Sequence, residues 1–265
     1  PRDVLDAPRD RRGFRPAIAP RDPFFDKPYE AASAEAPPVW ESQRPATRAG
    51  VSANIKTKRK VPALFKSFTE QAGLDYDVSL ETRGGSGLDF HLAEKLPQIG
   101  SKPWDVVVMH GFSLLDAEKP RDPAKLVATS KQMADFLRGK NPSADLFLIS
   151  TWARADNVYP EKGAWHGTSV ETMTKDVRAA YDQAAKNASI KTVIPVGESW
   201  LRAMQSGVAD ANPYDGIEAG KLNLWTYDSY HASTHGYYLQ ALLVVSMALR
   251  CSRQLTCLVQ PPFVY

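Results

Sequence analysis

The stretch Asp145-Leu146-Phe147-Leu148-Ile149-Ser150 decides the fold class, because it is a short and almost continuous apolar run. Such a run is typical of a strand that is buried on both faces of a parallel sheet. Two further runs have the same character, residues 104–109 (WDVVVM) and residues 192–196 (TVIPV). The sequence therefore predicts three buried strands in one sheet.

Helices are predicted between these strands from their apolar periodicity and from the residues at their ends. Residues 61–72 carry a proline in the first turn and are followed by Gly73, as helix ends favour. Further helices are predicted over residues 123–137, 168–186, 198–205 and 237–249. Residues 74–80 alternate apolar and polar side chains, which predicts one more strand. The whole pattern favours an α/β fold, a three-layer doubly wound parallel sheet with right-handed crossovers.

The first 48 residues differ from the rest of the chain. They hold nine prolines and show no sustained periodicity, so we expect an extended arm, followed by one α/β domain over residues 49–265. The arm is too aromatic for a simple spacer, and we expect some of these rings to contact the body or a neighbouring subunit. The aromatic residues are Phe14, Phe24, Phe25, Tyr29 and Trp40.

Composition excludes several classes of function. The net charge of +3 is small for 265 residues, which argues against a nucleic-acid partner. The one basic run, residues 56–60, is most simply a solvated approach to a helix. A bilayer span needs about 18 consecutive apolar residues, and the sequence contains no such stretch.

The cysteines and the first residue bear on the compartment. Cys251 and Cys257 are six residues apart and are either a small disulfide loop or two unpaired thiols. The chain begins at Pro1, so we expect a processed or truncated N-terminus. Together these features favour an extracytoplasmic, periplasmic or secreted, protein. Neither the spacing nor the neighbours of the cysteines predict a metal site.

The candidate catalytic residues lie in Asp228-Ser229-Tyr230-His231, just before the last apolar helix. An acid three residues before a histidine can orient the imidazole and support its charged form. Two solvated residues in a loop would give the same pattern. As a catalytic pair they need a nucleophile from elsewhere in the chain.

In an open parallel sheet the ligand site lies beyond the carboxyl ends of the strands. The glycine turn Arg83-Gly84-Gly85-Ser86-Gly87 follows the strand predicted over residues 74–80, and is either an oxyanion-binding turn or a flexible loop. His110 follows the next strand and is either an oxyanion donor or a buried structural histidine. Arg154, after the strand at 145–150, is predicted to be an exposed cation at a pocket wall.

The glycine turn does not match the common nucleotide or hydrolase signatures. Its spacing is neither that of a phosphate-binding loop nor that of the G-x-S-x-G nucleophile elbow. A nucleotide-binding α/β protein is therefore not favoured.

The order of these blocks, ending in D-x-x-H-x-S-x-x-G-x-x-L, resembles the SGNH/GDSL hydrolases over about residues 50–250. The resemblance implies a flavodoxin-like α/β fold and a serine hydrolase that needs no cofactor. It implies His231 as general base and Asp228 as its orienter. Ser52, in Gly50-Val51-Ser52, keeps the G-x-S frame of the nucleophile block, although valine stands where the family has Asp or Asn. Gly85 (or Gly84) and His110 would form the oxyanion hole, His110 standing where the family has asparagine.

Two functional hypotheses follow. The first is a serine ester hydrolase that removes acyl or acetyl groups from a small-molecule, glycan or lipid ester through Ser52, His231 and Asp228. The second is a catalytically weak or inactive hydrolase-like module, which binds a partner or another subunit through the proline-rich arm. The imperfect nucleophile block and the aromatic arm motivate the second hypothesis.

Overall fold

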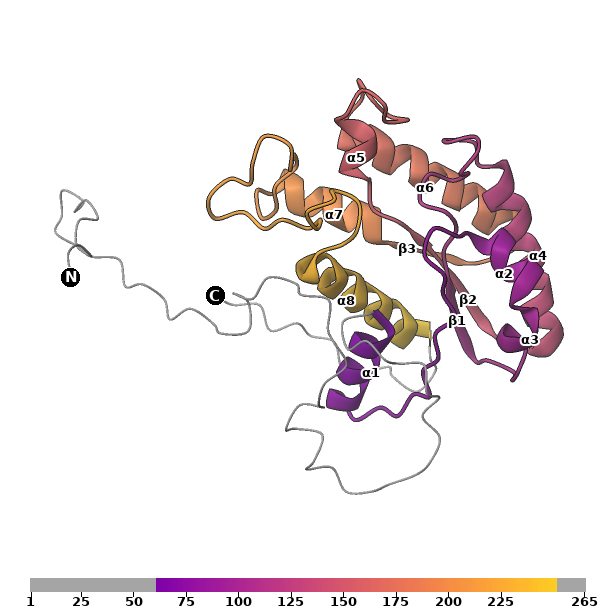
Figure 1. Ribbon diagram of the computed structural model, residues 1–265. Helices are drawn as coiled ribbons and strands as arrows, with labels where there is room; N and C mark the ends of the chain where they lie inside the picture. The colour runs from indigo at the N-terminus through magenta and orange to yellow at the C-terminus, as the bar shows by residue number, and fades with distance from the viewer. Residues whose placement is uncertain (1–60, 252–265) are drawn as a thin grey trace, which may run out of the picture. The chain divides into compact units, whose positions relative to one another are not determined.

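The computed structural model describes residues 61–251 of the chain, with side chains up to residue 247 (Figure 1). The predicted arm, Ser52, the basic run at 56–60 and both cysteine side chains lie outside this part. The arm over residues 1–48 and the domain boundary at residue 49 therefore stay predictions.

The centre of the molecule is a parallel sheet of three strands in the order β1-β2-β3. The strands are β1 (Val106–Met109), β2 (Asp145–Ser150) and β3 (Thr192–Pro195). Val106 pairs with Asp145 at the start of the first ladder, and Phe147 pairs with Thr192 at the start of the second. Each crossover thus joins neighbouring strands, as in consecutive strand–helix–strand units.

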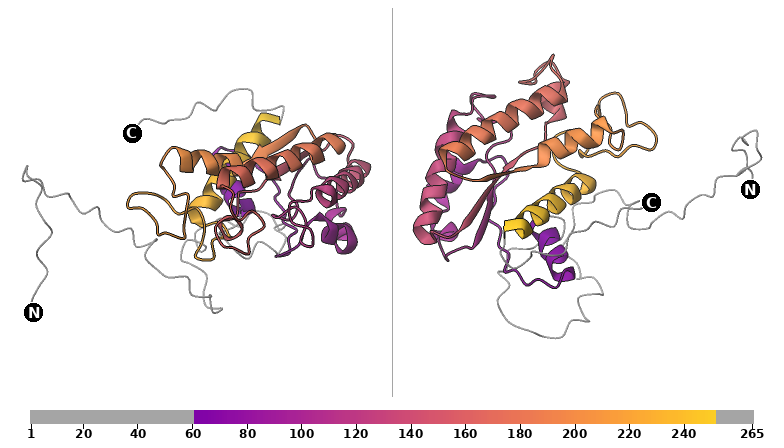
Figure 2. Two further views of the ribbon diagram at one scale, coloured as in Figure 1. Left: turned by 90° about the horizontal axis from the view of Figure 1, so that it is seen from above. Right: turned by 180° about the vertical axis from the view of Figure 1, so that it is seen from behind.

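Helices cover both faces of this sheet (Figures 1 and 2). On one side α6 (Val170–Asn187) packs on β2 and β3 and against α4 (Ala124–Lys140). On the other side α8 (Thr234–Cys251) packs on β3 and against α1 (Val61–Gln71), and α7 (Val196–Gln205) lies between α6 and α8. The three-layer α/β architecture predicted from the sequence is confirmed.

The core forms because β2 is the central strand and is covered on both faces. Leu146, Phe147, Leu148 and Ile149 are all buried, so the strand has no polar face. This explains why its sequence reads as a continuous apolar run rather than as an alternation.

Three tryptophans pack together on the α7 and α8 side of the core. The rings of Trp152 and Trp200 are stacked with centroids 4.8 Å apart and an interplanar angle of 9°. Trp225 meets Trp200 edge to face, with centroids 5.6 Å apart. Trp200 and Trp225 are buried, and Trp152 is half-buried. These rings underlie the segment that carries Asp228 and His231.

The prediction of a strand over residues 74–80 is wrong, because this segment is extended but pairs with no other strand. Its apolar side chains do face the core: the ring of Tyr76 packs edge to face on Phe65, 5.3 Å away, and Val78 joins the core cluster. The alternating carboxylates of Asp75 and Asp77 are exposed and pair with lysines. An extended segment lying along a helix therefore shows the same period of two as a strand does.

The helices predicted over residues 61–72, 123–137, 168–186, 198–205 and 237–249 are confirmed, with ends shifted by up to three residues. Three short helices were not predicted, namely α2 (Leu88–Glu94), α3 (Leu96–Ile99) and α5 (Ala155–Val158). They span one or two turns, which is too short for an apolar period to be visible.

Gly236 in the first turn of α8 is required by close packing. A Cβ atom at this position would lie 2.4 Å from Cζ2 of Trp200 and 2.5 Å from the carbonyl oxygen of Leu224. Gly236→Ala is therefore expected to destabilise the fold by about 1–3 kcal/mol, despite the better helix propensity of alanine. The free energy of unfolding, measured by urea denaturation, checks this.

The matched control is Gly139→Ala in α4, where an added Cβ meets nothing within 4 Å. That helical substitution is expected to stabilise the fold by about 0.4–1 kcal/mol. Equal effects of the two substitutions would contradict the packing constraint at Gly236.

Candidate active site

The candidate acid–base pair lies in a tight turn that its own backbone closes. Trp225 and Ala232 form an antiparallel bridge, and the N–H of Thr226 donates to the carbonyl of His231 at 2.8 Å. Ser229 takes a left-handed conformation, with φ of 56°. This conformation is uncommon for a residue with a side chain and reverses the chain direction between Asp228 and His231.

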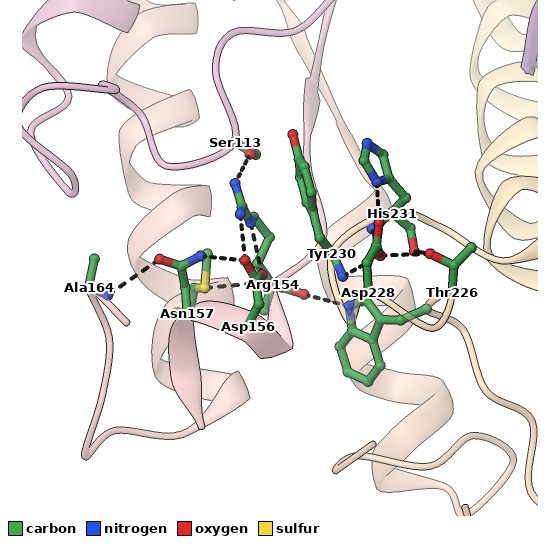
Figure 3. Close-up of polar contacts among 12 residues, drawn as sticks. Ser113, Arg154, Asp156, Asn157, Ala164, Thr226, Asp228, Tyr230 and His231 are labelled. Carbon is green, nitrogen blue, oxygen red and sulfur yellow. Dashed lines mark hydrogen bonds and ion pairs between the residues drawn. The ribbon is translucent and has the colours of Figure 1, made fainter. Parts of the chain in front are cut away.

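Asp228 is hydrogen-bonded on both carboxylate oxygens (Figure 3). Its Oδ2 lies 2.6 Å from Nδ1 of His231. Its Oδ1 accepts from the Thr226 hydroxyl at 2.7 Å and from the backbone N–H groups of Tyr230 and His231, each at 2.9 Å. Three donors from the turn thus fix the carboxylate independently of its contact with the imidazole.

Electrostatics keep Asp228 ionised. Partial burial acts to raise the pKa of Asp228, but the hydrogen bonds from His231, Thr226 and the backbone outweigh it and hold that pKa well below 3.8. For a carboxyl group with a lowered pKa, the stabilising effect is complete above the unfolded-state pKa and is lost as the pH falls through the folded-state pKa. Asp228 therefore remains a charged partner for His231 throughout the neutral range.

The imidazole of His231 reaches solvent, since 56% of its side chain is exposed. Its Nδ1 faces the carboxylate of Asp228 and therefore carries the proton. The lone pair on Nε2, at the other side of the ring, is directed away from Asp228. This is the tautomer that a general base needs when it accepts a proton at Nε2. The structure therefore brings together the two residues of the predicted acid–base pair.

The residues predicted to bind the oxyanion, Gly85 and His110, lie in loops outside this turn. Gly85 has φ of 70° in the glycine turn and lines a cavity of about 130 Å³, together with Gly111 and Phe112. His110 directly follows β1, and its Nδ1 lies 3.0 Å from the carbonyl oxygen of Gly111. His110 is exposed, so a buried structural histidine is the wrong interpretation.

Two findings limit what this cavity can do. His231 is not among the residues that line it. The N–H of Gly111 is directed into the core, where it donates to the hydroxyl of Tyr181 at 2.9 Å. That backbone donor is thus engaged within the protein, and an oxyanion would need other donors.

Arg154 differs from its prediction as an exposed cation. Only 11% of its side chain is exposed, because the guanidinium is held by Asp156 and lies on the ring of Tyr230. Its Nη1 donates to the hydroxyl of Ser113 at 3.2 Å. Only the place of Ser113 shortly after β1 could have indicated this contact from the sequence.

Ser52 lies outside the described residues, so its position relative to His231 stays a prediction. Among residues 61–251 no group of three His, Cys, Asp or Glu side chains is placed to hold a metal ion. In the same part of the chain, no helix is both long and apolar enough to cross a bilayer.

No protein-family model matches this sequence, and no curated protein matches it. Solved structures do resemble it. A DUF4886 family protein from Bacteroides uniformis superimposes with a TM-score of 0.55 at 16% identity, covering 71% of this chain and 77% of that one. A candidate SGNH hydrolase from Slackia heliotrinireducens gives 0.52 at 21% identity, covering 71% and 91%.

The fold is SGNH-hydrolase-like. A further structure with this architecture is an acetyl xylan esterase, with a TM-score of 0.51 at 16% identity, covering 72% of this chain and 92% of that one. The SGNH-like fold expected from the block order is thus confirmed. At these identities the likeness concerns the fold, and the roles of individual residues rest on the geometry of this chain.

Proposed function

We propose that this SGNH-like protein is a serine ester hydrolase that cleaves carboxylic esters with Ser52, His231 and Asp228. The observation that carries this proposal is the 2.6 Å contact between Asp228 Oδ2 and His231 Nδ1 on a half-exposed imidazole. Such a pair selects the tautomer of a general base and stabilises the imidazolium that forms.

In the proposed reaction, Ser52 Oγ attacks the ester carbonyl while Nε2 of His231 takes the hydroxyl proton. The tetrahedral intermediate collapses to an acyl-enzyme as Nε2 returns that proton to the leaving alcohol. Water then attacks the acyl group by the same route, which releases the acid and regenerates Ser52. The steps balance without a metal or an organic cofactor.

The developing oxyanion would be bound by the backbone N–H groups of Ser52 and Gly85, with His110 as a further donor. What supports Gly85 is its left-handed conformation, with φ of 70°, which turns the backbone within the glycine-rich segment. Loss of one such donor costs about 2.7–4 kcal/mol of transition-state stabilisation.

The substrate class is an acyl or acetyl ester on a small molecule, glycan or lipid. The likeness to an acetyl xylan esterase supports an acetylated glycan among these. Tyr227, adjacent to Asp228, is 96% exposed and offers a flat ring next to the site, on which a sugar could stack. The extracytoplasmic location stays a prediction.

A fluorophosphonate probe tests the proposal directly. We expect the native protein to be labelled at a single serine, and the heat-denatured protein to stay unlabelled, because only an activated serine reacts. Peptide mass spectrometry should place the adduct on Ser52. A native protein that is inert both to the probe and to p-nitrophenyl acetate would favour the binding-module hypothesis instead.

A further inference from the structure

The segment that follows β2, residues 152–156, holds the turn of Asp228 and His231 at three points. The indole N–H of Trp152 donates to the carbonyl of Tyr230 at 3.0 Å. The backbone N–H of Asp156 donates to the carbonyl of Ser229 at 3.2 Å. The guanidinium carbon of Arg154 lies 3.6 Å from the centroid of the Tyr230 ring. All three contacts fall on the two residues between the acid and the base.

Arg154 is itself fixed on several sides. Its Nε lies 3.0 Å from Oδ1 of Asp156, and its Nη2 lies 2.5 Å from Oδ2 of the same carboxylate. Its Nη1 donates to Ser113 after β1. A two-point pair with a carboxylate fixes the plane of a guanidinium, which lysine cannot do. The pair with Asp156 therefore fixes the plane of the guanidinium that lies on the ring of Tyr230.

Tyr230 contacts both the fixed guanidinium of Arg154 and the imidazole of His231. Its ring centroid lies 4.0 Å from that of His231, with an interplanar angle of 38°. Figure 3 shows Tyr230 between Arg154 and His231, with the three side chains extending in the same direction. The half-exposed imidazole is thus held by Asp228 at Nδ1 and by the Tyr230 ring along one face. Contacts on an edge and a face together restrict its rotation.

We propose that Arg154 is a positioning residue, which holds Tyr230 against His231 so that Nε2 keeps one direction. It acts through Tyr230 and does not contact the reacting atoms. The effect on turnover rests on the proposed esterase function, whereas the ordering of the turn does not. The two parts can therefore be tested separately.

The test compares Arg154→Met with wild type in the full-length protein. Methionine keeps the length and apolar stem but loses the charge and the N–H donors. Hydrogen exchange, followed by mass spectrometry, should become at least about tenfold faster in the peptide that spans residues 226–231, because the turn opens locally. With p-nitrophenyl acetate, kcat should fall by about 10² while KM changes less than twofold, since misplacement of a catalytic group by about 1 Å costs that much.

The control is Arg121→Met. Arg121 forms the same kind of contact, pairing with Asp176 at 3.0 Å and lying over the ring of Trp165 at 5.3 Å. This variant should leave exchange at residues 226–231 and kcat unchanged. Arg154→Lys should recover only a small part of kcat, because it restores charge without the planar fork. Full recovery in the lysine variant would overturn the role of the guanidinium plane.

The outcomes separate the two proposals. Faster exchange in Arg154→Met, combined with a wild type that cleaves no ester, would uphold positioning and reject the proposed function. Unchanged exchange would overturn positioning even if activity fell. If Arg154→Met does not fold, Tyr230→Leu serves instead, because it removes the ring through which Arg154 is proposed to act on His231. Unchanged exchange in that variant would equally reject the inference.

Discussion

Replacing His231 with alanine is expected to abolish ester hydrolysis while shifting the melting temperature by only a few degrees. Turnover should fall by about 10⁴–10⁶, the range seen when one member of a serine hydrolase triad is removed. The fold should tolerate the change because the imidazole is mostly exposed and Asp228 keeps its other three donors. Initial rates with p-nitrophenyl acetate and a thermal melt check both parts.

The matched control is His235→Ala, four residues along the chain and also exposed. It should keep wild-type turnover to within a few fold. Asp228→Asn should lose less than His231→Ala, since it disturbs the tautomer but leaves the proton acceptor in place. Full activity in His231→Ala would remove the acid–base assignment.

Ser52→Ala is expected to lower turnover by about 10⁶, with residual catalysis from oxyanion binding. The reason is that the acyl-enzyme route is closed when the nucleophile is missing, although substrate binding persists. The variant should also lose fluorophosphonate labelling completely. Steady-state kinetics and intact-mass spectrometry after probe treatment measure these two effects.

Ser86→Ala in the glycine turn is the control for a second serine, and it should remain labelled and active. An adduct that maps to Ser86 or Ser113 would keep the enzyme and discard Ser52 as nucleophile. Labelling that survives in Ser52→Ala would lead to the same conclusion.

The sheet could be predicted from the sequence wherever burial on both faces leaves no polar position. Asp145–Ser150 was predicted to the residue because both faces of β2 are covered. Residues 74–80 were mispredicted because alternation records which side chains are buried, and not whether a partner strand is present. Pairing is a long-range property that a local pattern does not contain.

The site could be predicted in part for a similar reason. Asp228 and His231 are three residues apart, so a local motif reveals their contact. The environment of Arg154 depends on Ser113 and Tyr230, which lie 41 and 76 residues away in the chain. A charged residue after a strand is therefore read as exposed, although its partners bury it.

The stacked tryptophans also give this protein an intrinsic optical probe. The rings of Trp152 and Trp200 are stacked with nearly parallel planes, close enough for their electronic transitions to couple, and Trp152 is hydrogen-bonded to the carbonyl of Tyr230. Any ligand or acyl group that displaces the Asp228–His231 turn must also disturb this indole pair. Near-ultraviolet circular dichroism and tryptophan emission can therefore follow events at the site in real time, in unlabelled protein and without a chromogenic substrate.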